Sequence, residues 1–195
     1  MGVTTKRLSL TDYLNYSDET DTCYELVNGE LIPMGLGTGR HGELGKRLVQ
    51  MFDQESDRTG HQWTALQSVV GVQSPRGEKW ETVRIPDVLV LPKEQWRTLQ
   101  NQEAVIRLGD SPPVLVVEVV SPSSQSIDYR AKRSEYSVLD IPEYWVIDPL
   151  EEKVTVFTLS EGWYDEAVFT GEARIISPTY PDFPLTVTQL LQGEI

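Results

Sequence analysis

Apolar and polar positions alternate along the chain in two distinct patterns. Residues 83–91 (VRIPDVLVL) and 113–120 (PVLVVEVV) are nearly continuous apolar runs rich in β-branched side chains, which is typical of strands buried on both faces. Residues 43–58 instead carry apolar side chains at helical spacing, namely Leu44, Leu48, Val49 and Phe52. This segment therefore predicts an amphipathic helix.

Turn residues and shorter runs complete the predicted order of elements. An Asn28-Gly29 pair lies between two apolar-polar runs within residues 24–33, which is the strongest short-range signal for a β-hairpin. We expect the remaining elements to be a short helix capped near Ser9, a strand over 62–72, a helix over 126–139, a strand over 144–147, a C-terminal β-meander over 153–159, 163–169 and 174–177, and a closing helix over 186–191. The fold class is thus α/β of the mixed α+β kind, in one domain covering residues 1–195.

Composition agrees with a folded globular domain. Apolar residues make up 39% of the chain and charged residues 24%, with five Trp and eight Tyr, unlike the aromatic-poor composition of disordered chains. The single Cys23 excludes an internal disulfide framework and a cysteine-based zinc site. No stretch has the ~18–20 consecutive apolar residues of a membrane span, and the N-terminus has no signal-peptide core. We expect a soluble, cytoplasmic protein.

The net charge of −13 is unusual for a protein that binds phosphates, because such surfaces are normally positive. The acidity is uneven. Residues 140–195 hold eleven acids against Lys153 and Arg174, which gives −9, whereas residues 1–139 hold nineteen acids and fifteen bases, which gives −4. The charge therefore opposes tight, non-specific binding to nucleic acid, but it is concentrated towards the C-terminus.

Two carboxylates interrupt the apolar runs. Asp87 lies within VRIPDVLVL and Glu118 within PVLVVEVV. Burying an unpaired carboxylate costs several kcal/mol, so such a group normally has a cation or a hydrogen-bond network beside it. Carboxylates on adjacent strands would converge and offer oxygen ligands to Mg²⁺, which binds through one or two carboxylates. The alternative is that each acid lies at a strand end and faces solvent or a basic residue.

A lysine follows on the next predicted helix. Asp128, Lys132 and Tyr136 recur every fourth residue, which places them on one helix face. An ammonium group is suited to stabilising an attacking hydroxide or the charge that develops on a phosphate. The alternative is a solvated helix face with an ordinary Asp–Lys pair. Arg130 and Arg133 flank Lys132 and are candidates for phosphate contact.

The order of these motifs resembles that of a known family. Pro86-Asp87, then EVVSPSS from Glu118, then Asp128, Lys132 and Tyr136, then EYWVIDP from Glu143, together resemble the Uma family of restriction-endonuclease-like proteins, within the PD-(D/E)XK nuclease superfamily. The resemblance covers about residues 10–160 and includes YELVNGEL from Tyr24. It implies a restriction-endonuclease-like core, a central mixed sheet flanked by helices, with the N-terminal hairpin and C-terminal meander added.

The resemblance also implies a reaction. It predicts Mg²⁺- or Mn²⁺-dependent hydrolysis of phosphodiester bonds in DNA by a homodimer, with Asp87 and Glu118 as metal ligands and Lys132 as a catalytic residue. The usual Glu-x-Lys motif would place lysine at position 120, which is Val120 here. Members of the family are thought to supply the lysine from the following helix, and Lys132 fits that role.

Three further polar residues have two interpretations each. The resemblance makes Glu25 a candidate third acid near the metal, or else it is an ordinary exposed hairpin glutamate. His41 either reaches the cleft as a phosphate contact or base, or simply caps its helix. Ser121 either offers its hydroxyl and amide to phosphate or only forms the turn before the Lys132 helix.

Two other function classes remain open. A protein that keeps the nuclease fold for binding or regulation, with weak or no catalysis, is consistent with the acidic surface and the displaced lysine. An enzyme acting on a small substrate has no cofactor motif to support it, because the Gly35-x-Gly37-x-Gly39 stretch lacks the preceding strand and the spacing of a dinucleotide-binding fingerprint.

Overall fold

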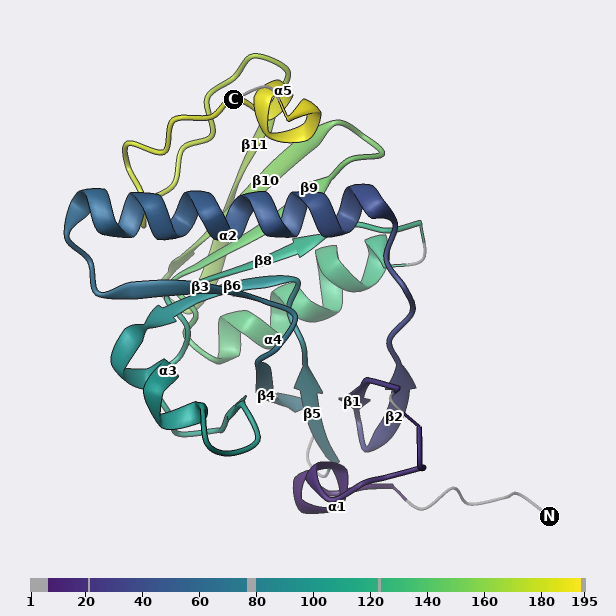
Figure 1. Ribbon diagram of the computed structural model, residues 1–195. Coiled ribbons are helices and arrows are strands. Elements are labelled where there is room, and N and C mark those ends of the chain that lie inside the picture. The colour runs from purple at the N-terminus through teal and green to yellow at the C-terminus, as the bar shows by residue number, and fades with distance from the viewer. Residues whose placement is uncertain (1–6, 21, 77–79, 123, 194–195) are drawn as a thin grey trace.

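The computed structural model describes residues 7–20, 22–76, 80–122 and 124–193, and in this part of the chain the strands form two sheets (Figure 1). The six-stranded sheet has the order β11-β10-β9-β8-β6-β3 and contains β3 (Trp63–Gln67), β6 (Val88–Pro92), β8 (Leu115–Val119), β9 (Glu143–Asp148), β10 (Lys153–Ser160) and β11 (Trp163–Thr170). The five-stranded sheet has the order β2-β1-β5-β4-β7 and contains β1 (Tyr24–Val27), β2 (Glu30–Pro33), β4 (Gly71–Arg76), β5 (Trp80–Arg84) and β7 (Val105–Ile106). Both sheets are mixed, since β8 runs parallel to β9 and β4 parallel to β7.

Helices cover both faces of the six-stranded sheet (Figure 1). The helices of the described residues are α1 (Leu10–Leu14), which packs against the five-stranded sheet, and α2 (Gly39–Thr59), α3 (Lys93–Leu99), the π-helix η1 (Ile127–Lys132), α4 (Arg133–Val138) and α5 (Val187–Gln192). Helix α2 packs Leu44, Leu48 and Phe52 on one face, and α4 packs Tyr136 on the other. The mixed α/β class expected from the sequence is confirmed, although the strands divide between two sheets instead of forming one.

The alternation of side chains along β8 decides which face Glu118 occupies. Val117 and Val119 join the apolar cluster under α2, whereas Val116 and Val120 join the cluster under α4. Because successive strand residues point to opposite faces, Glu118 lies on the α4 face. Its side chain is therefore directed towards η1 and α4.

The local signals at the two ends of the chain are confirmed. Ser9 caps α1, and β1 pairs with β2 through a two-residue turn at Asn28-Gly29. Both turn residues have positive φ, 52° and 77°, as a type I′ turn requires. Thr186 caps α5: its side-chain hydroxyl accepts a hydrogen bond from the Gln189 N–H, and its own N–H donates to Gln189 Oε1.

Two apolar runs that predicted single strands are each divided. The run over 62–72 breaks into β3 and β4, which belong to different sheets, because Ser68 adopts a left-handed φ of 51°. The run over 83–91 breaks at Ile85-Pro86-Asp87 into β5 and β6, where Pro86 has no N–H to donate to a ladder. Asp87 therefore precedes β6 and does not lie within a strand as expected.

The C-terminal prediction is correct for two of its three strands. Strands β10 and β11 form the expected antiparallel pair. Residues 174–177 form no strand, and Arg174 makes only an isolated bridge with Thr186. The helix predicted over 126–139 is confirmed, but its first part, η1, is a π-helix, a variant that occurs frequently at functional sites.

Candidate active site

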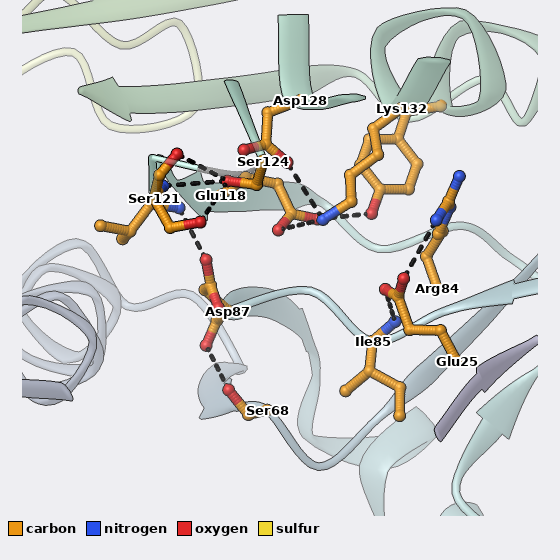
Figure 2. A network of polar contacts seen from close by, with 12 residues as sticks. Glu25, Ser68, Arg84, Ile85, Asp87, Glu118, Ser121, Ser124, Asp128 and Lys132 are labelled. Carbon is orange, nitrogen blue, oxygen red and sulfur yellow. Dashed lines mark hydrogen bonds and ion pairs between the residues drawn. The ribbon is translucent and has the colours of Figure 1, made fainter. Parts of the chain in front are cut away.

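A charged cluster lies in the apolar layer between β8 and the helix that covers it. Glu118 is only 2% exposed. Its Oε2 lies 2.7 Å from Lys132 Nζ, and its Oε1 accepts a hydrogen bond of 2.8 Å from the Tyr136 hydroxyl. Asp128 lies on the same helix face, with Oδ1 3.2 Å from Lys132 Nζ (Figure 2). The four-residue spacing seen in the sequence thus brings Asp128, Lys132 and Tyr136 around one carboxylate.

Asp87 is held beside this cluster by the register of the neighbouring strands. Strand β6 pairs with β8 so that Val88 faces Val117, and the next position of this register would pair Asp87 with Glu118. Asp87 Oδ2 accepts a hydrogen bond of 2.7 Å from the backbone N–H of Val119. Asp87 and Glu118 therefore lie in the same region, as expected from the sequence. Asp87 occupies the position immediately before the first residue of β6.

His41 reaches the same region from α2. Thr38 caps this helix by accepting a hydrogen bond of 3.2 Å from the His41 N–H. This start places His41 in the first turn, where its Nε2 lies 2.9 Å from Asp87 Oδ1. The hydrogen bond to Asp87 is the main reason that the pKa of His41 is raised. The contact makes His41 an orienting partner of Asp87.

Burial and the charges of neighbouring groups shift the pKa values of Glu118, Asp128 and Lys132. Burial, reinforced by Asp87 and Asp128, raises the pKa of Glu118 to about 8, although Lys132 opposes the shift. Burial also raises the pKa of Asp128. Burial alone would lower the pKa of Lys132, but Glu118 and Asp128 outweigh it and raise that pKa. Lys132 is therefore a protonated cation at neutral pH, surrounded by more carboxyl groups than one cation can neutralise if all of them ionise.

The donor set fits a hard divalent cation. Asp87 and Glu118 supply carboxylate oxygens, and Asp128 adds a third buried carboxyl group beside Lys132. Within this same part of the chain, no group of three or more His, Cys, Asp or Glu side chains is arranged to hold a metal alone. Mg²⁺ commonly binds through one or two carboxylates and fills its other positions with water and phosphate, so the residues present fit Mg²⁺ better than zinc.

Glu25 lies in a second charged group, separate from Asp87 in Figure 2. Its Oε2 is 3.0 Å from Arg84 Nη1, and its Oε1 accepts a hydrogen bond of 3.0 Å from the Ile85 N–H. Arg84 also contacts Glu135 on α4, with 2.8 Å between Nε and Oε2. Glu25 is thus a partly buried ion-pair partner on β1 and not an exposed hairpin glutamate, and its charge contributes to raising the pKa of Lys132. Its role as a third acid near the metal stays a prediction.

The remaining sequence candidates differ in accessibility. Ser121 N–H donates to Ser124 Oγ at 2.9 Å in the turn before η1. Arg130 is exposed. Arg133 instead contacts Glu166 of β11 at 3.0 Å and lies 4.5 Å from the ring centroid of Phe157 on β10. Of the two arginines, Arg130 is the one whose side chain is presented to solvent.

Two residues of the site, Asp128 and Tyr136, were not predicted from the sequence to have a role there. Asp128 and Tyr136 both contact the central ion pair, yet only Lys132 was assigned a role. Their spacing from Lys132 was the signal that could have identified them. A helix face that points at a buried carboxylate brings its polar residues there together.

Comparison with known proteins identifies the family. The Uma2 family, described as "Putative restriction endonuclease", matches residues 10–188. The chain belongs to this family. It is 29% identical over 147 residues, 74% of this chain and 77% of the relative, to the uncharacterized protein sll1609 of Synechocystis sp.. This confirms the resemblance seen in the motifs.

A solved structure has a similar fold. A crystal structure described as "a putative nuclease belonging to DUF820" from Anabaena variabilis superposes with a TM-score of 0.70 at 19% identity, covering 95% of this chain and 98% of that one. This likeness shows that the two chains share a fold. None of the helices in the described ranges has the length and apolar character needed to cross a membrane.

Proposed function

We propose that this Uma2 protein is a Mg²⁺- or Mn²⁺-dependent endonuclease that hydrolyses phosphodiester bonds in DNA. The observation that carries the proposal is the placement of Asp87 and Glu118 at adjoining strand positions, with Lys132 2.7 Å from Glu118. Membership in a family described as a restriction endonuclease supports the reaction class. The fold alone would not support a reaction class, because function depends on the residues of the site.

In this proposal Asp87 and Glu118 hold the metal. When bound, Mg²⁺ would polarise the scissile phosphate and lower the pKa of a water molecule. His41 orients Asp87 through the 2.9 Å contact, and Tyr136 orients Glu118 through its hydroxyl. Such supporting partners typically change metal affinity or activity by about 10–100-fold when removed.

Lys132 acts as a fixed positive charge. Because the surrounding carboxylates raise its pKa, it retains its proton at neutral pH and is unsuited to remove one from water. Its ammonium group instead stabilises negative charge on the attacking oxygen and on the phosphate. Removing one such stabiliser costs ~10²–10³ in rate.

A binding or regulatory protein without turnover is the second candidate. The observation in its favour is that Lys132 already contacts both Glu118 and Asp128, so it occupies part of the space that a metal would need. The net charge of −13 also disfavours strong binding of DNA. A metal would have to compete with Lys132 for Glu118.

Calorimetric titration of Mg²⁺ and Mn²⁺ tests the metal site. Binding should be detectable in the wild type and lost in Asp87→Ala and in Glu118→Ala. Glu94→Ala is the matched control, because Glu94 is an exposed acid on α3, and it should bind like the wild type. Equal affinities in all four proteins would rule out these ligands.

A further inference from the structure

A cavity of about 370 Å³ lies beside the segment that carries Asp87. Its walls come from α1, the loop that follows, β1 and the ends of β4, β5 and β7, and the residues that matter here are Tyr13, Tyr16, Asp18, Tyr24, Ile85 and Glu103. This volume is near the lower limit for small-molecule pockets. It suits a ligand the size of one nucleoside.

Aromatic rings dominate one side of the cavity. Tyr24 is fixed, because its hydroxyl donates to Asp18 Oδ2 at 2.6 Å and its carbonyl accepts from the Tyr13 hydroxyl at 2.6 Å. Tyr16 packs edge-on against Tyr24, with ring centroids 5.7 Å apart at 85°. Tyr16 keeps 44% of its surface exposed. An exposed ring braced by a fixed ring can accept a flat ligand.

The charges of the cavity select against phosphate. Among the described residues that line it, the charged ones are Asp18 and Glu103, and both repel an anion. Asp18 is already occupied by Tyr24 and by Thr20, whose hydroxyl donates at 2.6 Å. Glu103 is exposed, so its carboxylate can accept hydrogen bonds from the amino group of a base, as acidic side chains do with cytosine.

The cavity shares its wall with the proposed active site. Ile85 lines the cavity and is two residues from Asp87. Val69 also lines it and follows Ser68, whose N–H donates to the Asp87 carbonyl at 3.1 Å. The Ser68 hydroxyl donates to the same carbonyl at 3.4 Å (Figure 2). A strand whose phosphate lies at Asp87 would therefore have a neighbouring nucleotide within reach of the cavity.

We propose that this cavity binds one unpaired nucleobase of the DNA substrate, stacked on Tyr16 and held at its amino group by Glu103. The proposal rests on the proposed nuclease function for its choice of DNA. It predicts a preference for single-stranded, flapped or bulged DNA over uninterrupted duplex, because a paired base cannot leave the stack without an energetic cost. It also predicts that adenine and cytosine are favoured over thymine, which has no amino group.

Fluorescence anisotropy of labelled oligonucleotides in EDTA tests the cavity without any cleavage. Oligo(dA) of about twelve nucleotides, a length within the range bound by single-strand modules, should bind the wild type more tightly than oligo(dT) or a blunt duplex. Tyr16→Ala should weaken oligo(dA) binding by about tenfold, within the range for one stacked base. Tyr16→Phe should retain it, and Glu103→Ala should abolish the preference for dA over dT.

Trp163→Ala is the matched control, since Trp163 is a 78% exposed aromatic residue on β11 that does not line the cavity. It should bind like the wild type. Unchanged oligo(dA) binding in Tyr16→Ala, or an equal loss for the duplex, would overturn the base-binding role. Because the assay contains no metal, a failure of the nuclease proposal would appear separately, as absent cleavage with the base preference intact.

Discussion

At the scale of single residues, the site combines three carboxylates with one ammonium group. Glu118 is buried and contacts both Lys132 and Tyr136, while Asp87 and Asp128 add negative charge nearby and help to raise its pKa. A cluster with more acids than bases is less stable than the same cluster with a bound cation or proton. We expect the excess of acidic over basic groups to lower the free energy of unfolding of the metal-free protein.

Glu118→Gln should change how stability depends on pH. The folded-state pKa of Glu118, about 8, exceeds its ordinary value of 4.5, so the folded protein retains a proton that the unfolded chain releases. This contribution is complete below pH 4.5 and is lost as the pH rises through about 8. In EDTA, the wild type should lose on the order of 5 kcal/mol more than Glu118→Gln across this window in urea unfolding, the free energy that corresponds to a pKa raised from 4.5 to about 8. The exposed control Glu94→Gln should follow the wild type, and parallel curves for all three would contradict the shift.

At the scale of elements, an ion-pair network joins the five-stranded sheet to helix α4. Arg84 on β5, in the five-stranded sheet, forms two hydrogen bonds with Glu135 of α4, at 2.8 Å and 3.1 Å, and a third of 3.0 Å with Glu25 of β1. Helix α4 covers the six-stranded sheet and follows directly after Lys132. The network therefore fixes α4, which continues directly from η1 and Lys132, against the N-terminal hairpin.

Arg84→Ala should lower the free energy of unfolding by about 3–5 kcal/mol, because two buried carboxylates lose their counter-charge. Arg58→Ala serves as the control. Arg58 is 49% exposed and pairs with Glu55 at 2.7 Å, so its loss should cost less than ~1 kcal/mol. Urea unfolding monitored by circular dichroism would measure both. Similar small losses in the two variants would show that the network contributes little to holding α4.

Elements with a strong local signal were predictable from sequence, and those decided by tertiary contacts were not. The Asn28-Gly29 hairpin and the amphipathic α2 follow from turn chemistry and periodicity. The division of strands at Ser68 and at Pro86 depends on where the two sheets meet. Likewise, a carboxylate within an apolar run identified Glu118, whereas the contact between His41 and Asp87 joins residues 46 positions apart and has no local signal.

At the scale of the whole molecule, the acidic surface restricts how DNA can bind. With a net charge of −13, few phosphates can be neutralised by the protein, and residues 140–195 account for −9 of it. We expect productive binding to depend on the divalent cation and on the base-binding cavity more than on a basic surface. A homodimer, in which two sites would serve the two strands of a duplex, remains our proposal.

In the proposed mechanism, Lys132 stabilises the transition state of metal-dependent DNA cleavage. Single-turnover cleavage of single-stranded and flapped DNA in Mg²⁺ or Mn²⁺ measures it directly. Lys132→Met should reduce the rate by ~10²–10³ while leaving metal and DNA binding nearly intact. Lys93→Met, which replaces an exposed lysine paired with Asp57 at 3.3 Å, should cleave like the wild type. Equal rates in the two variants, or no metal-dependent cleavage by the wild type while DNA still binds, would contradict the account and favour the non-catalytic binding protein.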